Sequence, residues 1–473
     1  MGKSILLAEP DEHEAMARRA LDPDSMLEAF QRALPALARE PIRVTRCRIK
    51  TLKSGRGDVS RGTRLLYRVS IESTRGQRWE HTILGTAPVS VEPEPGARAG
   101  GERAAVGHPA LEPFEEPWGY IADLRMALRF FPVDPAMPSL LEVTRPDCGS
   151  LLAPFIADAR EGATIERVAF DLKRYKPANR CVLRVTAQVA RGRTRTERAV
   201  YIKFFSDDRG ARIHRTFKAL WEVARHATSL RLPEPLGYDP GRRMLVMAEA
   251  PGARDLSNWI KCLERDEPLP PGVDSPRLDR CMAEVARGLA ELHGSRISLP
   301  KQRTFRDELA DRRKDLACLE DSCPQLWKRA DDLLRRLEDN APAQEDLVPS
   351  HGGFRHKQTV GNERCLTVVD WDGLTMAPPA FDAANFLARL NERPLGRPPA
   401  ARPMERLAHR FRQCVLQEEP GLRPRDLTWY ECLALAEKAM RSFRRPRRGA
   451  RHESEAHHLL RAAHRMFDEG LTL

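Results

Sequence analysis

The stretch that decides the fold reads HGGFRHKQTVGNERCLTVVDWD and runs from residue 351 to residue 372. It begins with a polar, glycine-containing loop, His351–Gln358, and continues as an apolar strand, Leu366–Val369. Directly after this strand come Asp370 and Asp372. Carboxylates at a strand tip are the hard oxygen ligands that Mg²⁺ prefers together with phosphate oxygens. The stretch therefore predicts a polar, metal-binding phosphate site held by a short hairpin.

Helical patterns surround this stretch in the second half of the chain. Just downstream, Pro378–Phe386 reads PPAFDAANF and carries Asp382 at the start of a predicted helix. Elsewhere apolar residues recur at three- and four-residue spacing, which is typical of amphipathic helices. The pattern predicts further helices over Leu278–His293, Thr304–Glu320, Pro324–Asn340, Met404–Gln417, Trp429–Phe443 and Glu453–Asp468.

The first half of the chain contains two similar segments. Arg64–Ser70 reads RLLYRVS and Arg180–Thr186 reads RCVLRVT, and both alternate apolar and polar residues as strands do. In each copy a short helix and a first strand come before this strand, and an Arg-Gly turn and a third strand follow it. The shared order predicts a duplicated unit, a helix followed by an antiparallel meander. Only the second copy has a lysine in its third strand, Lys203, and the aligned position in the first copy is about Gly85.

The order of elements predicts an α+β protein with three parts. The first, residues 1–145, combines helices with a sheet, and the second, residues 146–252, is the second copy of that unit. The third, residues 253–473, is helical and contains the polar hairpin. Between the two copies, Pro88–Gly119 is rich in Pro, Gly and Glu and reads as a flexible connection.

The hairpin stretch resembles the signature of the aminoglycoside phosphotransferase and choline-kinase-like family. That signature is His-Gly-Asp-x-x-x-x-Asn/Gln, an apolar strand into Asp-x-Asp/Glu, and then Pro-x-x-Asp-x-Ala. The resemblance covers about residues 146–470 and is most specific over residues 346–390. It implies a protein-kinase-like, two-lobed fold with a small antiparallel sheet lobe and a helical lobe. Residues 1–145 would then be an additional N-terminal α/β domain that looks like a duplicated N-lobe.

The resemblance also assigns roles to residues of the hairpin and implies Mg²⁺ as a cofactor. His351 takes the place of the structural histidine of the catalytic loop, and Gln358 takes that of the Asn/Gln metal ligand. Asp370 takes the place of the principal Mg²⁺ ligand, and Asp372 takes that of the accessory acidic residue. Asp382 would brace the loop. The catalytic set is thus His351, Asp370 and Asp372, and the metal set is Gln358, Asp370 and Asp372.

The same resemblance implies ATP as the second cofactor. Lys203 would bind its phosphates, and Glu222 on the following helix would form an ion pair with this lysine. The basic turn that contains Lys176 lies where the family has its phosphate-covering loop. The apolar stretch Met244–Ala250, which closes with Glu249 and Ala250, resembles the hinge strand whose backbone receives adenine.

One position departs from the signature, because Gly353 stands where the family has the aspartate that serves as catalytic base. A well-placed general base contributes about 10²–10⁴-fold to rate. Asp372 is one candidate replacement. His356 is another, because its unperturbed pKa of about 6.5 suits a base, although it also reads as a solvent-facing loop residue.

Three functions follow from this combination of residues. The first is an ATP-dependent phosphotransferase that acts on a hydroxyl of a small molecule or peptide. The second is a pseudokinase that binds nucleotide or a partner and serves as a scaffold. The third, adenylyl transfer, has no positive support in the sequence. Fold alone does not decide among them.

The charge of the chain and its lack of long apolar segments limit the kinds of partner that we expect. The net charge is +12, which favours anionic partners such as nucleotide phosphates. The densest basic run, Arg441–Arg451, contains one aromatic residue, so we expect no nucleic-acid partner. The acidic run Asp307–Asp311 either faces a cationic acceptor or is plain helix surface. No segment has the roughly 18 apolar residues that a membrane span needs, and we expect a cytoplasmic protein without a membrane partner.

Overall fold

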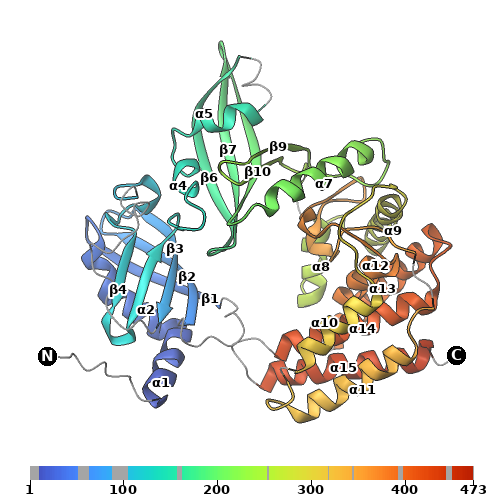
Figure 1. Ribbon diagram of the computed structural model, residues 1–473. Coiled ribbons are helices and arrows are strands. Elements are labelled where there is room, and N and C mark those ends of the chain that lie inside the picture. The colour runs from blue at the N-terminus through green and yellow to red at the C-terminus, as the bar shows by residue number, and fades with distance from the viewer. Residues whose placement is uncertain are drawn as a thin grey trace. The chain divides into compact units, whose positions relative to one another are not determined.

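The computed structural model divides into two compact units (Figure 1). The first comprises residues 1–211 and 236–247, and the second comprises residues 212–235 and 248–473. Among the described residues, no helix is both long enough and apolar enough to cross a membrane. The structure describes residues 10–51, 63–87, 105–156, 162–252, 255–317, 319–343, 346–391, 398–443 and 450–471.

The first sheet of the first unit follows two amphipathic helices. Helix α2 starts cleanly because the Asp22 carboxylate accepts a hydrogen bond from the Ser25 N–H and Pro23 occupies the first helical position. On one face of the sheet, the side chains at alternate positions of the strands are mostly apolar and form a core that includes Tyr67 and, from α2, Phe30. The strand order is β1-β2-β3-β5-β4, with antiparallel neighbours throughout. The elements are α1 (Pro10–Leu21), α2 (Pro23–Ala33), β1 (Ile42–Thr51), β2 (Thr63–Ser73), β3 (Arg78–Ala87), β4 (Trp118–Ile121) and β5 (Met126–Phe130).

The second sheet has the same topology as the first. Its order is β6-β7-β8-β10-β9, so in both sheets a three-stranded meander is followed by a fifth strand placed between the third and the fourth. This shared order is what a duplicated sheet lobe predicts. The elements are α4 (Leu140–Val143), α5 (Gly149–Leu152), β6 (Thr164–Lys176), β7 (Arg180–Arg191), β8 (Thr194–Phe205), β9 (Pro235–Asp239) and β10 (Met244–Ala248).

The strand registers correct one detail of the sequence alignment. Lys203 pairs with Val182, and the equivalent of Val182 in the first copy is Leu66, which pairs with Leu84. The position that corresponds to Lys203 is therefore Leu84 and not Gly85. The conclusion that the first copy offers no ammonium group there is unchanged.

The connection between the two sheets is only partly described. Residues 88–104 of the predicted flexible segment lie outside the described residues. The remainder is ordered by its own contacts, because Phe114 is buried in the core of the first sheet. This part contains η3 (Pro109–Leu111) and leads into β4.

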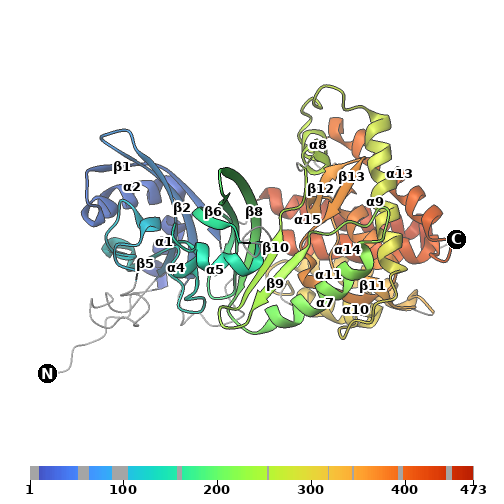
Figure 2. The same ribbon diagram turned by 90° about the horizontal axis from the view of Figure 1, so that it is seen from above.

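The second unit is helical and holds two two-stranded sheets. The long helices predicted from the apolar spacing are present, and α8 is a helix that was not predicted. Strands β12 and β13 lie beside α8 and α9 (Figure 2). The helices are α7 (Arg209–Ala224, which begins in the first unit), α8 (Asp255–Arg265), α9 (Ser275–His293), α10 (Phe305–Ala317), α11 (Pro324–Asp339), α12 (Ala380–Asn391), α13 (Pro398–Glu418), α14 (Pro424–Phe443) and α15 (Ala450–Leu471). The strands are β11 (Val348–Ser350) paired with β14 (Thr375–Ala377), and β12 (Thr359–Asn362) paired with β13 (Cys365–Val368).

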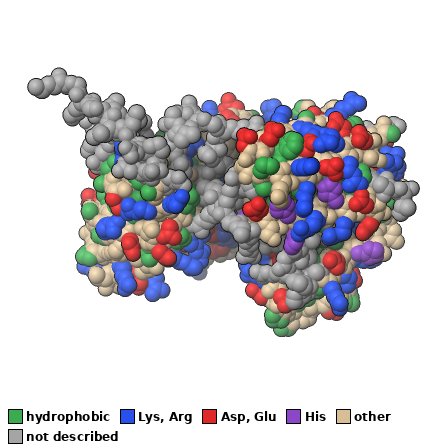
Figure 3. Space-filling model, turned by 90° about the horizontal axis from the view of Figure 1, so that it is seen from below, with side chains coloured by type: hydrophobic (Ala, Val, Ile, Leu, Met, Phe, Trp, Pro, Cys, Tyr) green, Lys and Arg blue, Asp and Glu red, His purple; other side chains and the backbone are tan. Residues whose placement is uncertain are grey.

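The surface of the helical unit mixes both signs of charge. On the face in Figure 3, Lys and Arg side chains alternate with Asp and Glu side chains over this unit. Arg441, at the start of the densest basic run, forms an ion pair with Glu437 one helical turn earlier. Residues 444–449 of that run lie outside the described residues.

Candidate active site

The loop that begins at His351 is pinned by one buried carboxylate. Asp382, in the first turn of α12, is completely buried. Its Oδ2 accepts the N–H of His351 at 2.5 Å, and its Oδ1 accepts the N–H groups of Gly353 and Phe354 at 3.0 and 3.2 Å. Three backbone donors thus converge on one anion, a charge-assisted arrangement that holds a loop firmly. The brace expected from Asp382 is present.

Two glycines shape this loop in different ways. Gly352 has φ +82°, and a β-carbon there would lie 2.0 Å from the carbonyl oxygen of Gly373. The backbones of the two loops therefore touch, and only glycine fits between them. Gly353 has φ +143°, a conformation that L side chains rarely adopt, yet nothing lies within 4 Å of its missing β-carbon.

His351 connects the loop to the strand tip that carries the carboxylates. Its Nε2 lies 3.1 Å from the carbonyl oxygen of Val369, which can only accept, so Nε2 carries the proton. The ring packs on Trp371 with centroids 4.7 Å apart, and the Trp371 Nε1–H donates to Val368 O at 2.7 Å. The imidazole is buried. This position suits a residue that orients the loop and the strand tip relative to each other.

The residues predicted as metal ligands lie on neighbouring stretches of backbone. Pairing of β12 with β13 sets Gln358 beside Val369, whose N–H donates to the Gln358 carbonyl at 2.8 Å. Asp370 comes next and adopts the left-handed conformation, φ +74°, at the start of the turn Trp371–Gly373. Asp370 and Asp372 are both half-buried.

The Gln358 side chain supplies the test of whether a cation fits. Its Oε1 is buried and has no hydrogen-bond partner among the described residues. A buried amide oxygen without a partner costs about 1–3 kcal/mol of folding free energy. An amide oxygen of this kind, on a residue whose backbone pairs with Val369 directly before Asp370, forms with the two half-buried carboxylates a set of donor types that a hard divalent cation takes. These residues fit Mg²⁺.

His356 lies on the inner side of the loop. Its ring is buried against the equally buried Glu264 of α8, with Nε2 and Oε1 3.8 Å apart. The interpretation of His356 as a solvent-facing residue is therefore wrong. Because the ring is buried in this pair, the structure does not offer it to a substrate hydroxyl.

The predicted nucleotide residues are divided between the two units. In the first unit, Lys203 is buried on β8 and Lys176 is exposed at the end of β6. In the second, Glu249 and Ala250 are half-buried directly after β10. Glu222, near the end of α7, is exposed and forms an ion pair with Arg225 at 3.4 Å, one turn along the same helix. The assignment of Glu222 as the lysine's partner stays a prediction.

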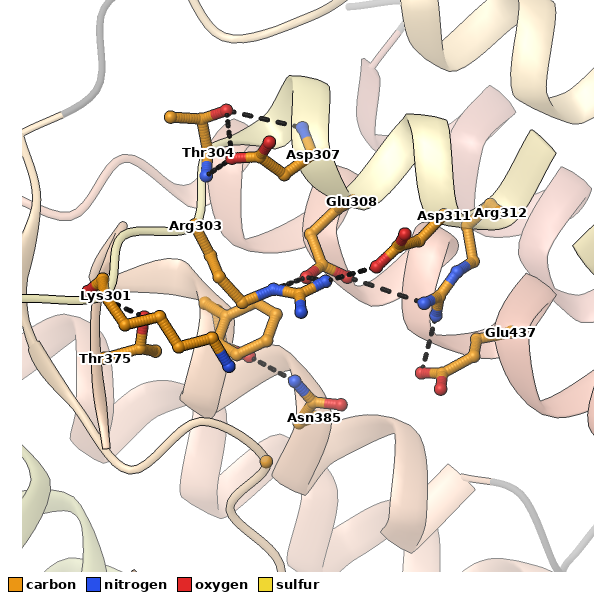
Figure 4. Close-up of polar contacts among 12 residues, drawn as sticks. Lys301, Arg303, Thr304, Asp307, Glu308, Asp311, Arg312, Thr375, Asn385 and Glu437 are labelled. Atoms are coloured by element: carbon orange, nitrogen blue, oxygen red, sulfur yellow. Dashed lines mark hydrogen bonds and ion pairs between the residues drawn. The ribbon is translucent and has the colours of Figure 1, made fainter. Parts of the chain in front are cut away.

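A charge network next to β14 was not predicted from the sequence (Figure 4). The segment before α10 pairs with β14, because the Met376 N–H donates to Lys301 O and the Arg303 N–H donates to Met376 O, both at 2.8 Å. From this segment the Arg303 guanidinium contacts Glu308 and Asp311. The signal that could have indicated it is the basic KQR run at residues 301–303.

Helix α10 contributes the acidic half of this network. Glu308 is buried between Arg303 and Arg312, and Arg312 also contacts Glu437 of α14 at 2.9 Å. Burial raises the pKa of Glu308, against the opposing effect of the two arginines. The remaining acid, Asp307, accepts hydrogen bonds from the N–H and the hydroxyl of Thr304.

These contacts show how each carboxylate of the acidic run Asp307–Asp311 is placed. Glu308 is buried against Arg303 and Asp311 is half-buried against the same guanidinium, while Asp307 is exposed and accepts hydrogen bonds from Thr304. The ammonium group of Lys301 is exposed, and partial burial, followed by the positive charges of Arg303 and Arg212, lowers its pKa.

Comparisons with known proteins give one family match. Residues 186–425 match the family model described as the phosphotransferase enzyme family. No curated protein matches the chain.

Similar solved structures include a choline/ethanolamine kinase family protein from Mesorhizobium loti. That structure is 14% identical and covers 63% of this chain and 88% of its own, with a TM-score of 0.41. A choline kinase from Cryptosporidium parvum Iowa II is 11% identical and covers 68% and 94%, with a TM-score of 0.47. An aminoglycoside-3'-phosphotransferase of type VIII is 20% identical and covers 56% and 92%, with a TM-score of 0.37.

Proposed function

Because the chain belongs to the phosphotransferase enzyme family, we propose that it transfers the terminal phosphoryl group of ATP to a hydroxyl of a small molecule, with Mg²⁺ as the metal. One observation carries the proposal more than any other. The buried Oε1 of Gln358 has no hydrogen-bond partner in the described part of the chain, and the Gln358 backbone pairs with Val369, directly before Asp370. A protein that had abandoned metal and nucleotide would gain by satisfying or exposing this oxygen.

Gln358, Asp370 and Asp372 would hold the cation, which would neutralise phosphate charge during transfer. Lys203 would contribute a second positive charge toward the phosphates, and the turn containing Lys176 would cover them. The protein's own work is positioning, since phosphoryl transfer needs little covalent chemistry from the enzyme.

The missing base lowers the expected rate without removing the activity. Gly353 has no side chain to accept the hydroxyl proton, and His356 is buried against Glu264. Asp372 is half-buried at the strand tip and is the remaining candidate for that proton. Without a dedicated base we expect turnover about 10²–10⁴-fold below that of an enzyme that has one.

The test is a titration of the purified protein with ATP and Mg²⁺, with binding followed by calorimetry and ADP release measured in the same samples. The informative variant is Asp370→Asn, because asparagine tolerates the left-handed backbone of residue 370 and the change removes only the charge. Its matched control is Asp266→Asn, an exposed aspartate with φ +59° after α8.

We expect wild type and Asp266→Asn to bind ATP and release ADP slowly, and Asp370→Asn to lose at least tenfold in both. Binding without ADP release, with or without candidate acceptors, would favour the pseudokinase alternative. No binding at all would refute the nucleotide roles of Lys203 and Asp370 together.

A further inference from the structure

A buried aspartate joins the segment after the first sheet to the basic turn of the second sheet. Asp134 follows β5 and is only 3% exposed. Its Oδ2 accepts the Tyr175 hydroxyl at 2.9 Å and the Ala178 N–H at 2.8 Å, while its Oδ1 accepts the Ala136 N–H at 3.0 Å. One carboxylate thus fixes its own turn and the β6–β7 turn together. Burial, and then the negative charge of Asp134, raise the pKa of Tyr175 well above its ordinary value.

The turn held in this way is strained and carries positive charge. Ala178 has φ +53°, a left-handed conformation that costs a residue other than glycine roughly 1–2 kcal/mol. The hydrogen bond to Asp134 falls on this same residue. From the other side, Asn179 O accepts the N–H of Ser206 at 3.1 Å and the side chain of Arg209. Lys176 stands exposed at the beginning of the turn.

Apolar packing supports the same junction. Phe131, three residues before Asp134, packs on the Tyr175 ring with centroids 5.3 Å apart. Leu66 and Leu84 of the first sheet lie in the same buried cluster. Leu84 stands at the position that Lys203 occupies in the second sheet. The face that could have held phosphates in the first copy is therefore apolar and covered.

We infer that Asp134 is a positioning residue for nucleotide, and that the first sheet domain serves to hold the β6–β7 turn in its phosphate-covering conformation. The inference rests on the proposed function, because it assumes that this turn contacts the phosphates. The first sheet domain has Leu84 where the second has Lys203, so it would act on nucleotide only through the turn that it holds. Fixing the turn before nucleotide arrives reduces the ordering cost of binding.

The test uses three variants and two measurements. Asp134→Asn removes the negative charge. Tyr175→Phe removes a single hydroxyl and keeps the hydrogen bond from the Ala178 N–H to the Asp134 carboxylate. The matched control is Tyr67→Phe, since the Tyr67 hydroxyl is equally buried and donates to Ala20 O at 2.9 Å within the first sheet domain. Hydrogen exchange reports on the Ala178 amide, and ADP release at varied ATP gives KM and kcat.

We expect Asp134→Asn to speed exchange of the Ala178 amide at least tenfold and to raise the KM for ATP at least fivefold, with kcat within twofold of wild type. Tyr175→Phe should give smaller changes in the same direction, and Tyr67→Phe should change neither quantity. Unchanged exchange in Asp134→Asn would refute the clamp. Faster exchange with an unchanged KM would refute its link to nucleotide.

The two proposals fail in different ways. If the wild-type protein neither binds ATP nor releases ADP, the proposed function fails and the assignment of Asp134 to nucleotide positioning fails with it. The exchange measurement needs no nucleotide, so it still decides whether Asp134 holds the turn. If Asp134→Asn does not fold, Tyr175→Phe carries both measurements.

Discussion

The substitution Asp382→Asn tests how the loop is held. An amide has one carbonyl oxygen, so at best it keeps the bonds from Gly353 and Phe354 and turns its NH₂ toward the His351 N–H, where the carboxylate oxygen now sits at 2.5 Å. A hydrogen bond to a charged group contributes about 1.5–3 kcal/mol and a neutral one about 0.5–1.5 kcal/mol. Losing one charged bond and weakening two therefore costs about 4 kcal/mol. Total folding free energies are only about 5–15 kcal/mol.

Urea unfolding and ADP release measure the two consequences. We expect Asp382→Asn to lose about 4 kcal/mol of unfolding free energy, and at least 10²-fold in turnover because the loop shifts relative to the strand tip. The control is Asp468→Asn in the same unit, where an exposed carboxylate forms an ion pair with Arg336. Surface pairs of this kind contribute about 0–1 kcal/mol each. A loss below about 1 kcal/mol in Asp382→Asn, or unchanged turnover, would refute the argument that this carboxylate holds the loop.

Two further predictions follow from the backbone and from a buried histidine. Gly352→Ala should destabilise the second unit by more than the roughly 1–2 kcal/mol expected for a left-handed alanine, because the new β-carbon would clash with the carbonyl oxygen of Gly373. The control is Gly76→Ala, which has nearly the same φ, +80°, and whose β-carbon would meet no atom within 4 Å. Equal losses of unfolding free energy in urea for the two variants would contradict the clash. Burial lowers the pKa of His81 from 6.5 to about 4, so the unfolded chain takes up the proton first as pH falls. Stability is therefore lost between about pH 6.5 and 4, by roughly 3 kcal/mol in all. This part of the pH dependence of urea unfolding should disappear in His81→Leu, and an identical profile in that variant would show that His81 is not the group responsible.

Much of the fold could be predicted because its local patterns agree with its tertiary structure. The meander β6–β8 follows an alternation in which Cys181, Leu183 and Val185 face the core. Period-2 and period-3.6 patterns are decided by neighbouring residues, so one sequence suffices to see them. Helix α8 was missed, although its buried positions Leu256, Trp259 and Ile260 recur at the spacing of a helix.

The site was predictable where one motif carries all its parts and unpredictable where distant segments meet. His351, Gln358, Asp370 and Asp382 lie within 32 residues of one another in the chain, and their spacing is enough to place them around one hairpin. The contact of His356 with Glu264 joins residues 92 positions apart. No sequence periodicity encodes such a pairing, so the burial of His356 could not be foreseen.

Gly353 is a second position at which the sequence alone could not predict the structural reason for its residue. The sequence shows that the carboxylate of the family signature is replaced by glycine, and the structure adds that the backbone disfavours a side chain there. Space for a side chain exists, but φ +143° is a conformation that costs a residue other than glycine about 1–3 kcal/mol. The loop cannot easily relax at this residue, because the N–H groups of Gly353 and Phe354 are tied to Asp382 and Gly352 touches Gly373. Adding aspartate at residue 353 would therefore place a base on a strained loop and recover only part of the roughly 10²–10⁴-fold that a well-placed base contributes. The loop is built around glycine, and any transfer that it supports depends on positioning and charge.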